Sequence, residues 1–327
     1  MIVACGEALI DMVPEKDGAG RDLYAPCPGG SPYNTAVAAG RLLGKDALDR
    51  PRTAFLSRLS RDFFGETLVR RLEENNVSVE LIRRSGENTT LAFVKLEEDR
   101  EPAYIFYTEG AADRSLVPED IPSRLPSGTD CILFGSISLT LEPSASAIEG
   151  LIFRERDRPG GPVISLDPNV RPMMIRDKDA YVRRFESWVH ASAVVKISAV
   201  DFDCIYPGLG LEKSAERILS MGPRFAVVTL GAEGAMAFFR TGGGDLCRVP
   251  SPAADLPVAD TIGAGDTFHG AFLAWLEDQG LMSRRALGFL KEGELREALD
   301  FANRAAALVC SRRGADPPFL AELQALV

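Results

Sequence analysis

The chain is poor in the residues that build transition-metal sites. Its 327 residues include two histidines, and its six cysteines are scattered without a C-x-x-C pair. Zinc and related metals need clustered cysteine and histidine ligands, so no transition-metal site is expected. Dispersed cysteines in apolar segments are typical of reduced thiols, which favours a cytoplasmic protein.

A basic surface and a long apolar segment are missing as well. The 37 lysines and arginines are outnumbered by 47 aspartates and glutamates, giving a net charge of −10. We expect no nucleic-acid partner, because no basic field attracts its phosphates, although a local site can still bind an anionic nucleotide. No apolar run reaches membrane-spanning length, and the first residues, M-I-V-A-C-G-E, enter a strand without a basic leader. The pattern therefore predicts no membrane partner.

What the sequence does contain is a series of short apolar runs that alternate with helical patterns. From residue 130 on, helical patterns fill most gaps between the earlier runs, which indicates a parallel sheet with crossover helices. These runs predict an α/β fold with a mainly parallel central sheet. The expected strands cover residues 2–5, 8–12, 53–56, 131–134, 163–166, 194–197, 226–229 and 235–239.

Two runs in the first third of the chain have a different pattern. Residues 89–96 and 103–107 alternate apolar and polar residues across the turn E-E-D-R-E, as an antiparallel hairpin with one exposed face does. A hairpin does not belong in a doubly wound core, so this pattern predicts a lid over a site. The exposed face of the hairpin also offers a surface for a homodimer.

No linker, internal repeat or low-complexity tract divides the chain. We therefore expect a single domain of residues 1–327, with a lid inserted from residues 12–28 and 89–108. The stretch at residues 14–30 is rich in proline, glycine and aspartate, which predicts a loop or an irregular excursion.

The stretch D-T-I-G-A-G-D-T-F-H-G at residues 260–270 carries the strongest chemical signal. Consecutive backbone N–H groups can converge on an anion at three small residues, Gly263, Ala264 and Gly265. The apolar run at residues 268–276 predicts a buried helix whose N-terminal dipole adds to this anion site. Asp266 lies where the turn becomes the helix, as expected of a base that deprotonates a hydroxyl attacking a phosphoryl group. A helix N-cap is the alternative role for Asp266. His269 either faces the site or packs against the sheet, and packing is the favoured interpretation.

A second glycine-containing segment, G-G-S-P-Y-N-T-A-V-A-A-G-R-L-L-G, begins at Gly29. Gly29 and Gly30 allow the backbone to approach a ligand, and small residues at 35–40 allow the following helix to lie close to a neighbouring backbone. The Asn34 amide can donate to and accept from sugar hydroxyls. A simple helix N-terminus with Asn34 in its first turn is the alternative. Asp11 lies near a strand end, where α/β folds place their ligands.

Polar residues also follow three later strands. The loop D-P-N-V-R-P begins at Asp167, and its prolines stiffen the backbone around Arg171, which suits a phosphoryl group or a surface salt bridge. In K-I-S-A-V-D, Lys196 suggests phosphate contact, and Asp201 could hold Mg²⁺ through water. Another hydroxyl-plus-glycine turn, T-L-G-A-E-G, contains Thr229, Gly231 and Gly234. Because the carboxyl ends of parallel strands meet at one edge of the sheet, we expect these groups to form one phosphate-binding site.

Together these segments resemble the PfkB family of carbohydrate kinases, which share the ribokinase-like fold. The resemblance runs from G-E-A-L-I-D near the start to R-G-A at residues 313–315. It implies a three-layer fold with a small β lid, and ATP-dependent phosphorylation of a small sugar at a primary hydroxyl. It also implies that Asp266 is the catalytic base and that the preceding G-A-G turn is the anion hole for the transferring group, with Arg171 stabilising its charge.

The resemblance assigns binding roles to further residues. It implies that the sugar is held by Asp11, Gly29, Gly30, Asn34, Phe106 and Asp266. The ATP side would be formed by Lys196, Ser198, Thr229, Gly231, Gly234 and Asn303. Mg²⁺ would bridge the phosphates near Asp201. Many members bind a monovalent cation such as K⁺ near the anion hole, where this chain has Asp260, Ile262, Ser311 and Gly314.

Within the family the chain is most similar to bacterial fructokinases, on the segments G-E-A-L-I-D, G-S-I-S-L, D-P-N-V-R-P and F-Y-T-E-G-A-A-D. Fructose is therefore the expected acceptor. Thr108 stands where relatives usually have arginine, which weakens the alternative of a 2-keto-3-deoxygluconate kinase but also removes a polar contact to fructose. Ser198 and Asp201 replace the family's N-x-x-E motif with a carboxylate one methylene shorter. A ribonucleoside kinase is another alternative, and so is a non-catalytic sugar- or nucleotide-binding regulator, which would not need a base at Asp266.

Overall fold

The computed structural model describes residues 1–95 and 103–326, and the strands of these residues form two sheets. Neighbouring strands of the larger sheet are parallel, except where β13 and β14 extend it in antiparallel fashion. Its order is β14 (Leu246–Ser251), β13 (Ala235–Arg240), β12 (Phe225–Thr229), β11 (Val194–Ser198), β10 (Val163–Asp167), β9 (Cys131–Gly135), β1 (Ile2–Cys5), β4 (Thr53–Ser60) and β5 (Val77–Ser78), with β6 (Ile82–Ser85) also paired to β4.

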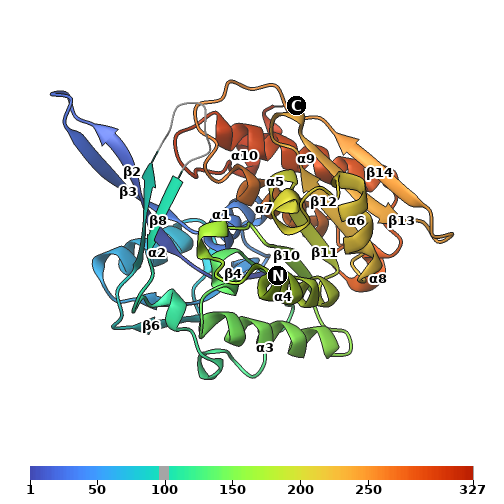
Figure 1. Ribbon diagram of the computed structural model, residues 1–327, viewed down its shortest axis with the longest axis horizontal. Coiled ribbons are helices and arrows are strands. Elements are labelled where there is room, and N and C mark those ends of the chain that lie inside the picture. The colour runs from blue at the N-terminus through green and yellow to red at the C-terminus, as the bar shows by residue number, and fades with distance from the viewer. Residues whose placement is uncertain (96–102, 327) are drawn as a thin grey trace.

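Each central strand is buried on both faces, which explains its continuous apolar sequence. In β1, Ile2 and Ala4 join one hydrophobic core, whereas Val3 and Cys5 join the core on the opposite face. The sheet is therefore the middle of three layers (Figure 1). This arrangement confirms the α/β fold. A strand lies at every expected position, but the run at residues 8–12 becomes β2 (Leu9–Lys16) of the smaller sheet and not part of the central one.

Helices cover both faces of the sheet. On the face that Ile2 joins are α1 (Ser31–Leu43), α2 (Phe63–Glu74), α7 (Ala264–Asp278), α8 (Arg284–Leu287), α9 (Glu292–Cys310) and α10 (Leu320–Gln324). On the other face are α3 (Ser144–Asp157), α4 (Lys178–Ala191), α5 (Ala199–Ile205) and α6 (Leu211–Ser220). Short 3₁₀ turns are η1 (Asp113–Ser115), η2 (Pro118–Asp120), η3 (Ser136–Leu139), η4 (Pro172–Met174) and η5 (Gly231–Glu233).

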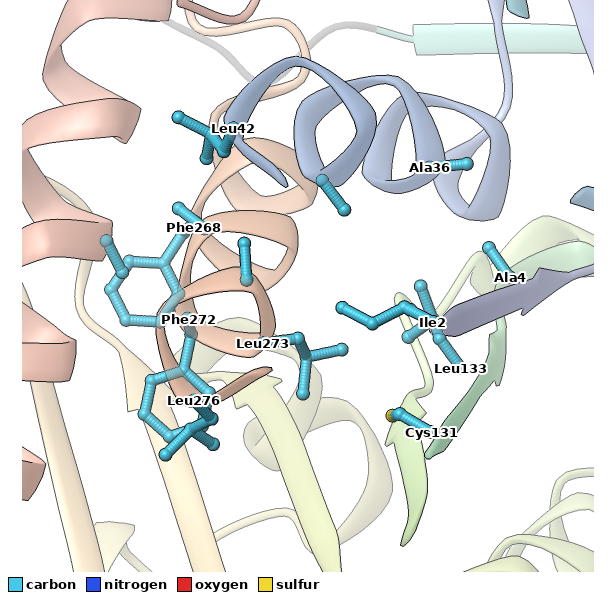
Figure 2. Close-up of a cluster of buried hydrophobic side chains, with 14 of the residues drawn as sticks. Ile2, Ala4, Ala36, Leu42, Cys131, Leu133, Phe268, Phe272, Leu273 and Leu276 are labelled. Carbon is cyan, nitrogen blue, oxygen red and sulfur yellow. The ribbon is translucent and has the colours of Figure 1, made fainter. Parts of the chain in front are cut away.

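Helices α1 and α7 pack closely against each other over the same face of the sheet. Figure 2 shows Ala36 of α1 and Phe268 of α7 in the cluster that covers Ile2 and neighbouring strands. A Cβ atom at Gly270 would lie 2.7 Å from the Thr35 carbonyl oxygen, too close for any residue but glycine. The small residues at 35–40 thus allow α1 to lie close to a neighbouring backbone, as the sequence predicts. The N-terminus of α1 lies next to the start of α7.

A smaller sheet projects from the three-layer body (Figure 1). Its strands run in the order β3 (Asp22–Gly29), β2 (Leu9–Lys16), β7 (Thr90–Lys95) and β8 (Ala103–Tyr107). The predicted hairpin is confirmed, because β7 and β8 pair in antiparallel fashion; its E-E-D-R-E turn lies outside the described residues. The expectation of an irregular segment at residues 14–30 is wrong, since β2 and β3 form a second antiparallel hairpin there.

Over the described residues, the helices are all too short or too polar to cross a membrane. The six cysteines are free thiols, two of them buried and four partly exposed.

Candidate active site

One cleft of about 640 Å³ opens at the carboxyl edge of the larger sheet and beneath the smaller one. The sheet neighbours of β1 are β4, which is the next strand of the larger sheet along the chain, and β9, which comes much later. Open α/β sheets bind ligands where strand order reverses in this way. The cleft is lined by loops that follow β1, β9, β10, β11 and β12, and by the N-termini of α1 and α7.

The floor of the cleft is the turn that leads into α7. Gly263 has φ 75°, a left-handed conformation, and it caps the helix that begins at Ala264. An added Cβ at Gly263 would also lie 2.7 Å from the Ala315 side chain. The turn therefore requires glycine, and it places the N-terminus of a 15-residue helix at the cleft.

Asp266 lies in the first turn of α7 with 8% of its surface exposed. The Ser31 hydroxyl donates to Oδ1 at 2.7 Å, and the Asn34 amide donates to Oδ2 at 2.9 Å. Burial raises the pKa of Asp266 to about 6, although these two hydrogen bonds oppose the shift. The carboxylate is therefore ionised at neutral pH and more basic than an ordinary aspartate.

One end of the cleft presents hydroxyl-binding groups under the smaller sheet. Asp11 of β2 and Arg171 both line it, together with Tyr104 and Phe106 of β8. Burial, followed by the nearby Asp266 charge, raises the pKa of Asp11 to about 7, and Arg171 opposes this shift. The Arg171 guanidinium lies 5.7 Å from the Tyr104 ring centroid. A carboxylate, a guanidinium and two aromatic rings suit a small polyol.

The other end of the cleft is formed by backbone and small side chains. Thr229, Gly231 and Gly234 line it, as does Asn303, whose amide donates to the Ser251 carbonyl at 3.0 Å. Ser198 lines the same end and caps α5. An open glycine-containing edge next to a helix N-terminus suits the phosphates of a nucleotide.

Asp201 is held tightly by the backbone at this end. Its Oδ1 accepts from the Val170 N–H at 2.8 Å, and its Oδ2 accepts from the Ser198 N–H at 3.2 Å. Within residues 1–95 and 103–326, acidic, histidine and cysteine side chains do not gather into any metal-binding cluster of three or more.

A separate loop lies behind the turn, where Asp260 organises the backbone. Its Oδ1 accepts from the Ile262 N–H at 3.0 Å, and its Oδ2 accepts from the Gly314 N–H at 2.8 Å. The Ser311 hydroxyl donates to the Leu308 carbonyl at 2.8 Å. The carboxylate thus draws two chain segments together beside the start of α7.

Comparison with known proteins decides the family. The model of the pfkB family of carbohydrate kinases matches residues 1–322. The chain belongs to this family. It is 37% identical to a fructokinase of Rhizobium leguminosarum bv. trifolii over 302 residues, which is 92% of this chain and 87% of that relative.

Solved structures of this kinase family have the same fold. A fructokinase from Xylella fastidiosa with bound ATP superposes with a TM-score of 0.85 at 28% identity, covering 99% of this chain and 97% of that one. A fructokinase double mutant from Vibrio cholerae O395, bound to fructose, ADP and a potassium ion, gives a TM-score of 0.81 at 27% identity, with coverage of 99% and 97%.

The kinase fold brings most of the predicted site residues together. Those lining the cleft are Asp11, Gly30, Asn34, Phe106, Arg171, Lys196, Ser198, Asp201, Thr229, Gly231, Gly234, Ile262, Gly263, Ala264, Gly265, Asp266 and Asn303. Gly29 lies behind Asp11, where an added Cβ would lie 2.0 Å from its Oδ2. The cleft lining does not include Asp260, Ser311 and Gly314, which form the loop behind it.

Two residues of the kinase site were missed by the sequence analysis. Ser31 holds Asp266, and Glu7 accepts from the Ser31 N–H at 3.2 Å and from the Ser138 N–H at 3.2 Å. Burial raises the pKa of Glu7, while hydrogen bonds from Ser138 and other neighbours oppose the shift. The available signal was an acidic residue two positions after the end of the buried strand β1, a place that favours ligand contact.

Proposed function

We propose that this protein is an ATP-dependent fructokinase that transfers the γ-phosphoryl group of ATP to a primary hydroxyl of fructose. One observation carries the proposal: Asp266 is buried at the N-terminus of α7, between a hydroxyl-binding end and a phosphate-binding end of the same cleft. The relatives named as fructokinases, and the neighbour bound to fructose and ADP, support the choice of sugar.

In the proposed reaction Asp266 removes the proton from the acceptor hydroxyl. The hydroxyl oxygen then bonds to the γ-phosphorus, while the bond from that phosphorus to the bridging oxygen of ADP breaks. Charge that develops on the transferring group is stabilised by the N–H groups of the Gly263–Gly265 turn and by Arg171. ADP leaves, and Asp266 later releases its proton to solvent.

The proposal includes two cations, Mg²⁺ and K⁺, and the chain has residues that could bind each of them. Asp201 faces the phosphate end and would contact water on a magnesium ion that neutralises phosphate charge. The loop of Asp260, Ile262, Ser311 and Gly314 would hold K⁺ next to the anion turn. The hydrogen bonds of Asp260 and the potassium ion in the Vibrio cholerae O395 structure support this second site.

The smaller sheet is proposed to act as the lid over the sugar. Tyr104 and Phe106 line the cleft from β8, and Asp11 lines it from β2. Closing this sheet would exclude water and so limit ATP hydrolysis in the absence of sugar. A cytoplasmic location is part of the same proposal, supported by the free thiols.

Coupled ADP release tests the proposal. The assay would use Mg-ATP with fructose, ribose, adenosine, 2-keto-3-deoxygluconate or no acceptor, in K⁺ and then in Na⁺ buffer. We expect strong turnover with fructose in K⁺ buffer and weaker turnover with fructose in Na⁺ buffer. Asp266→Asn should retain nucleotide binding but lower kcat by roughly three orders of magnitude or more, because a general base and its charge are lost.

The outcomes separate the parts of the proposal. Turnover with another acceptor alone would keep the mechanism and reject fructose. If kcat of the Asp266→Asn variant stays within a fewfold of the unaltered enzyme, Asp266 is not the catalytic base. Measurable ATP binding without turnover on any acceptor would reject the kinase proposal for this acceptor panel.

A further inference from the structure

A buried ion pair lies directly behind the anion turn. Lys196 Nζ and Asp167 Oδ2 are 2.9 Å apart, with side chains 5% and 4% exposed. A Cβ atom added to Gly265 would lie 3.0 Å from Lys196 Nζ, so the ammonium lies against the turn itself. Because burying two charges is costly and adds little net stability, their retention here points to a functional role.

His269 approaches the same carboxylate from one turn further along α7. The ring is fully buried, its Nε2 lies 2.8 Å from the Ser165 hydroxyl, and its Nδ1 lies 3.7 Å from Asp167 Oδ2. Packing against the sheet, the favoured interpretation, is therefore confirmed. Burial lowers the pKa of His269, although Asp167 opposes the shift, so the ring is neutral at pH 7. If Ser165 donates to Nε2, the proton lies on Nδ1 and faces Asp167.

Asp167 Oδ2 thus lies 2.9 Å from the Lys196 ammonium and 3.7 Å from Nδ1 of the neutral His269 ring, and among the described residues this Nδ1 has no hydrogen-bond partner. Burial acts to raise the pKa of Asp167, but Lys196 and His269 outweigh it and hold the pKa below its usual value. Over the part of the chain that the structure describes, its Oδ1 has no hydrogen-bond partner. The buried charge therefore depends on Lys196 and His269 for compensation.

We propose that Asp167 and His269 are positioning residues that hold the Lys196 ammonium under the anion turn, where it contacts the transferring phosphoryl group. This inference rests on the proposed kinase reaction. It assigns Lys196 to the transferring γ-phosphoryl group, whereas the family resemblance assigns it only to the ATP side of the site. An ammonium has three N–H donors, so one can face Asp167 while two face phosphoryl oxygens. A cation fixed before the reaction stabilises developing charge without reorganisation. Lys196 exchanges no proton in the step; Asp266 alone takes the proton of the hydroxyl.

Lys196→Met tests the contact. We expect kcat with fructose to fall by about 100-fold or more, as when one preorganised donor to a transition state is lost. ADP lacks the transferred group, so its dissociation constant, measured by calorimetry, should stay within about twofold of the unaltered enzyme. If ADP binding weakens in parallel with the loss of kcat/KM for ATP, Lys196 binds the nucleotide and the proposal is wrong.

Two amide substitutions of His269 test the positioning role. Asparagine places its amide near the position of Nδ1, whereas glutamine places it near Nε2. We expect His269→Asn to stay within a fewfold of the unaltered kcat and His269→Gln to lose about tenfold, with KM for both substrates unchanged. Equal kcat losses in the two variants, or losses that follow their melting temperatures, would reject the role.

The dependence of kcat/KM on pH is a further test, because a purely structural role of Lys196 and Asp167 would not shift it. The charged groups that face Asp266 are Asp11 from β2, Asp167 from β10 and Lys196 from β11. Removing the positive charge with Lys196→Met should move the acid limb of kcat/KM to higher pH, and Asp167→Asn should move it to lower pH. Shifts in the same direction would overturn the inference. If the unaltered enzyme turns over fructose but neither variant shifts the pH profile, this inference alone is rejected. If the unaltered enzyme shows no turnover, the proposed function is rejected.

Discussion

At the scale of single residues, the position of Asp266 is determined by two side chains of α1. Ser31 and Asn34 donate to different oxygens of the carboxylate, and each oxygen keeps a further lone pair for a proton. Burial raises the pKa of Asp266 to about 6, which leaves it ionised at pH 7 and basic enough to accept a hydroxyl proton in the transition state. The same contacts that orient the proposed base therefore also limit the rise of its pKa.

Ser31→Ala should move the acid limb of kcat/KM for fructose to higher pH. The proposed reaction needs ionised Asp266, so we expect kcat/KM to rise with pH through the pKa of about 6. The Ser31 hydrogen bond favours the ionised form, so its loss raises this pKa and costs more activity at low pH than at high pH. The measurement is kcat/KM between about pH 5 and 9.

Ser31→Thr is the matched control for this prediction, since it keeps the hydroxyl and should keep the profile. Asp11 titrates near the same range, with a pKa of about 7, so the comparison between variants is the informative quantity. A Ser31→Ala profile that overlays that of the unaltered enzyme would contradict the role of this hydrogen bond.

At the scale of elements, the central strands were predictable because they are buried on both faces. Their continuous apolar runs, such as residues 131–134, admit few other structures. Strand β3 could not be recognised, because Pro26 and Pro28 are typical of loops. It is an edge strand, and prolines are tolerated there since one side of the strand needs no ladder hydrogen bonds.

The site was predictable only where a residue's role follows from its own segment. The turn before Asp266 and the glycines after the strands have local signatures, and the structure brings them into one cleft. Glu7 and His269 act through partners more than 100 residues away in the chain, with Glu7 bound to Ser138 and His269 bound to Ser165. Their importance depends on tertiary contacts that no local pattern records.

Strand β7 is attached to the main body through two consecutive threonines. Asp62 accepts from the Thr89 N–H at 2.8 Å and from the Thr89 hydroxyl at 2.7 Å, and it also caps α2 through the Gly65 N–H. The Thr90 hydroxyl donates to buried Asp113 at 2.5 Å. The start of the proposed lid is therefore anchored by two carboxylates of the body.

Thr89→Val should lower the free energy of unfolding by about 1–3 kcal/mol, because a hydrogen bond to a partly buried carboxylate is lost. Urea denaturation measures this change. Thr67→Val is the matched control, since the Thr67 hydroxyl is exposed and bonds to its own helix at Phe63, so its effect should stay within about 0.5 kcal/mol. Equal destabilisation by the two substitutions would show that the Asp62 contact contributes nothing specific.

At the scale of the whole molecule, the outer face of the smaller sheet is unusually apolar. Ile105 is 64% exposed and Tyr107 is 61% exposed. Tyr24, Phe93 and Tyr107 form a row of edge-to-face rings, with centroids 5.2 Å and 5.6 Å apart. The opposite face of the same sheet carries Tyr104 and Phe106 and covers the cleft. Strand β8 thus supplies residues that line the cleft on one face and an exposed apolar surface on the other.

We propose that this outer face pairs with the same face of a second copy, because a closed twofold dimer covers an apolar patch with an identical one. Sedimentation equilibrium at micromolar concentration should give twice the chain mass, and Ile105→Lys should give the monomer. Phe289→Lys, which changes an equally apolar residue that is 76% exposed outside the smaller sheet, should leave the dimer intact. A monomeric unaltered protein, or a dimer that survives Ile105→Lys, would show that the face does not pair two copies. Because a dimer would hold both lids against each other, the monomeric variant should also release ADP faster without sugar, as an unsupported lid excludes water less well.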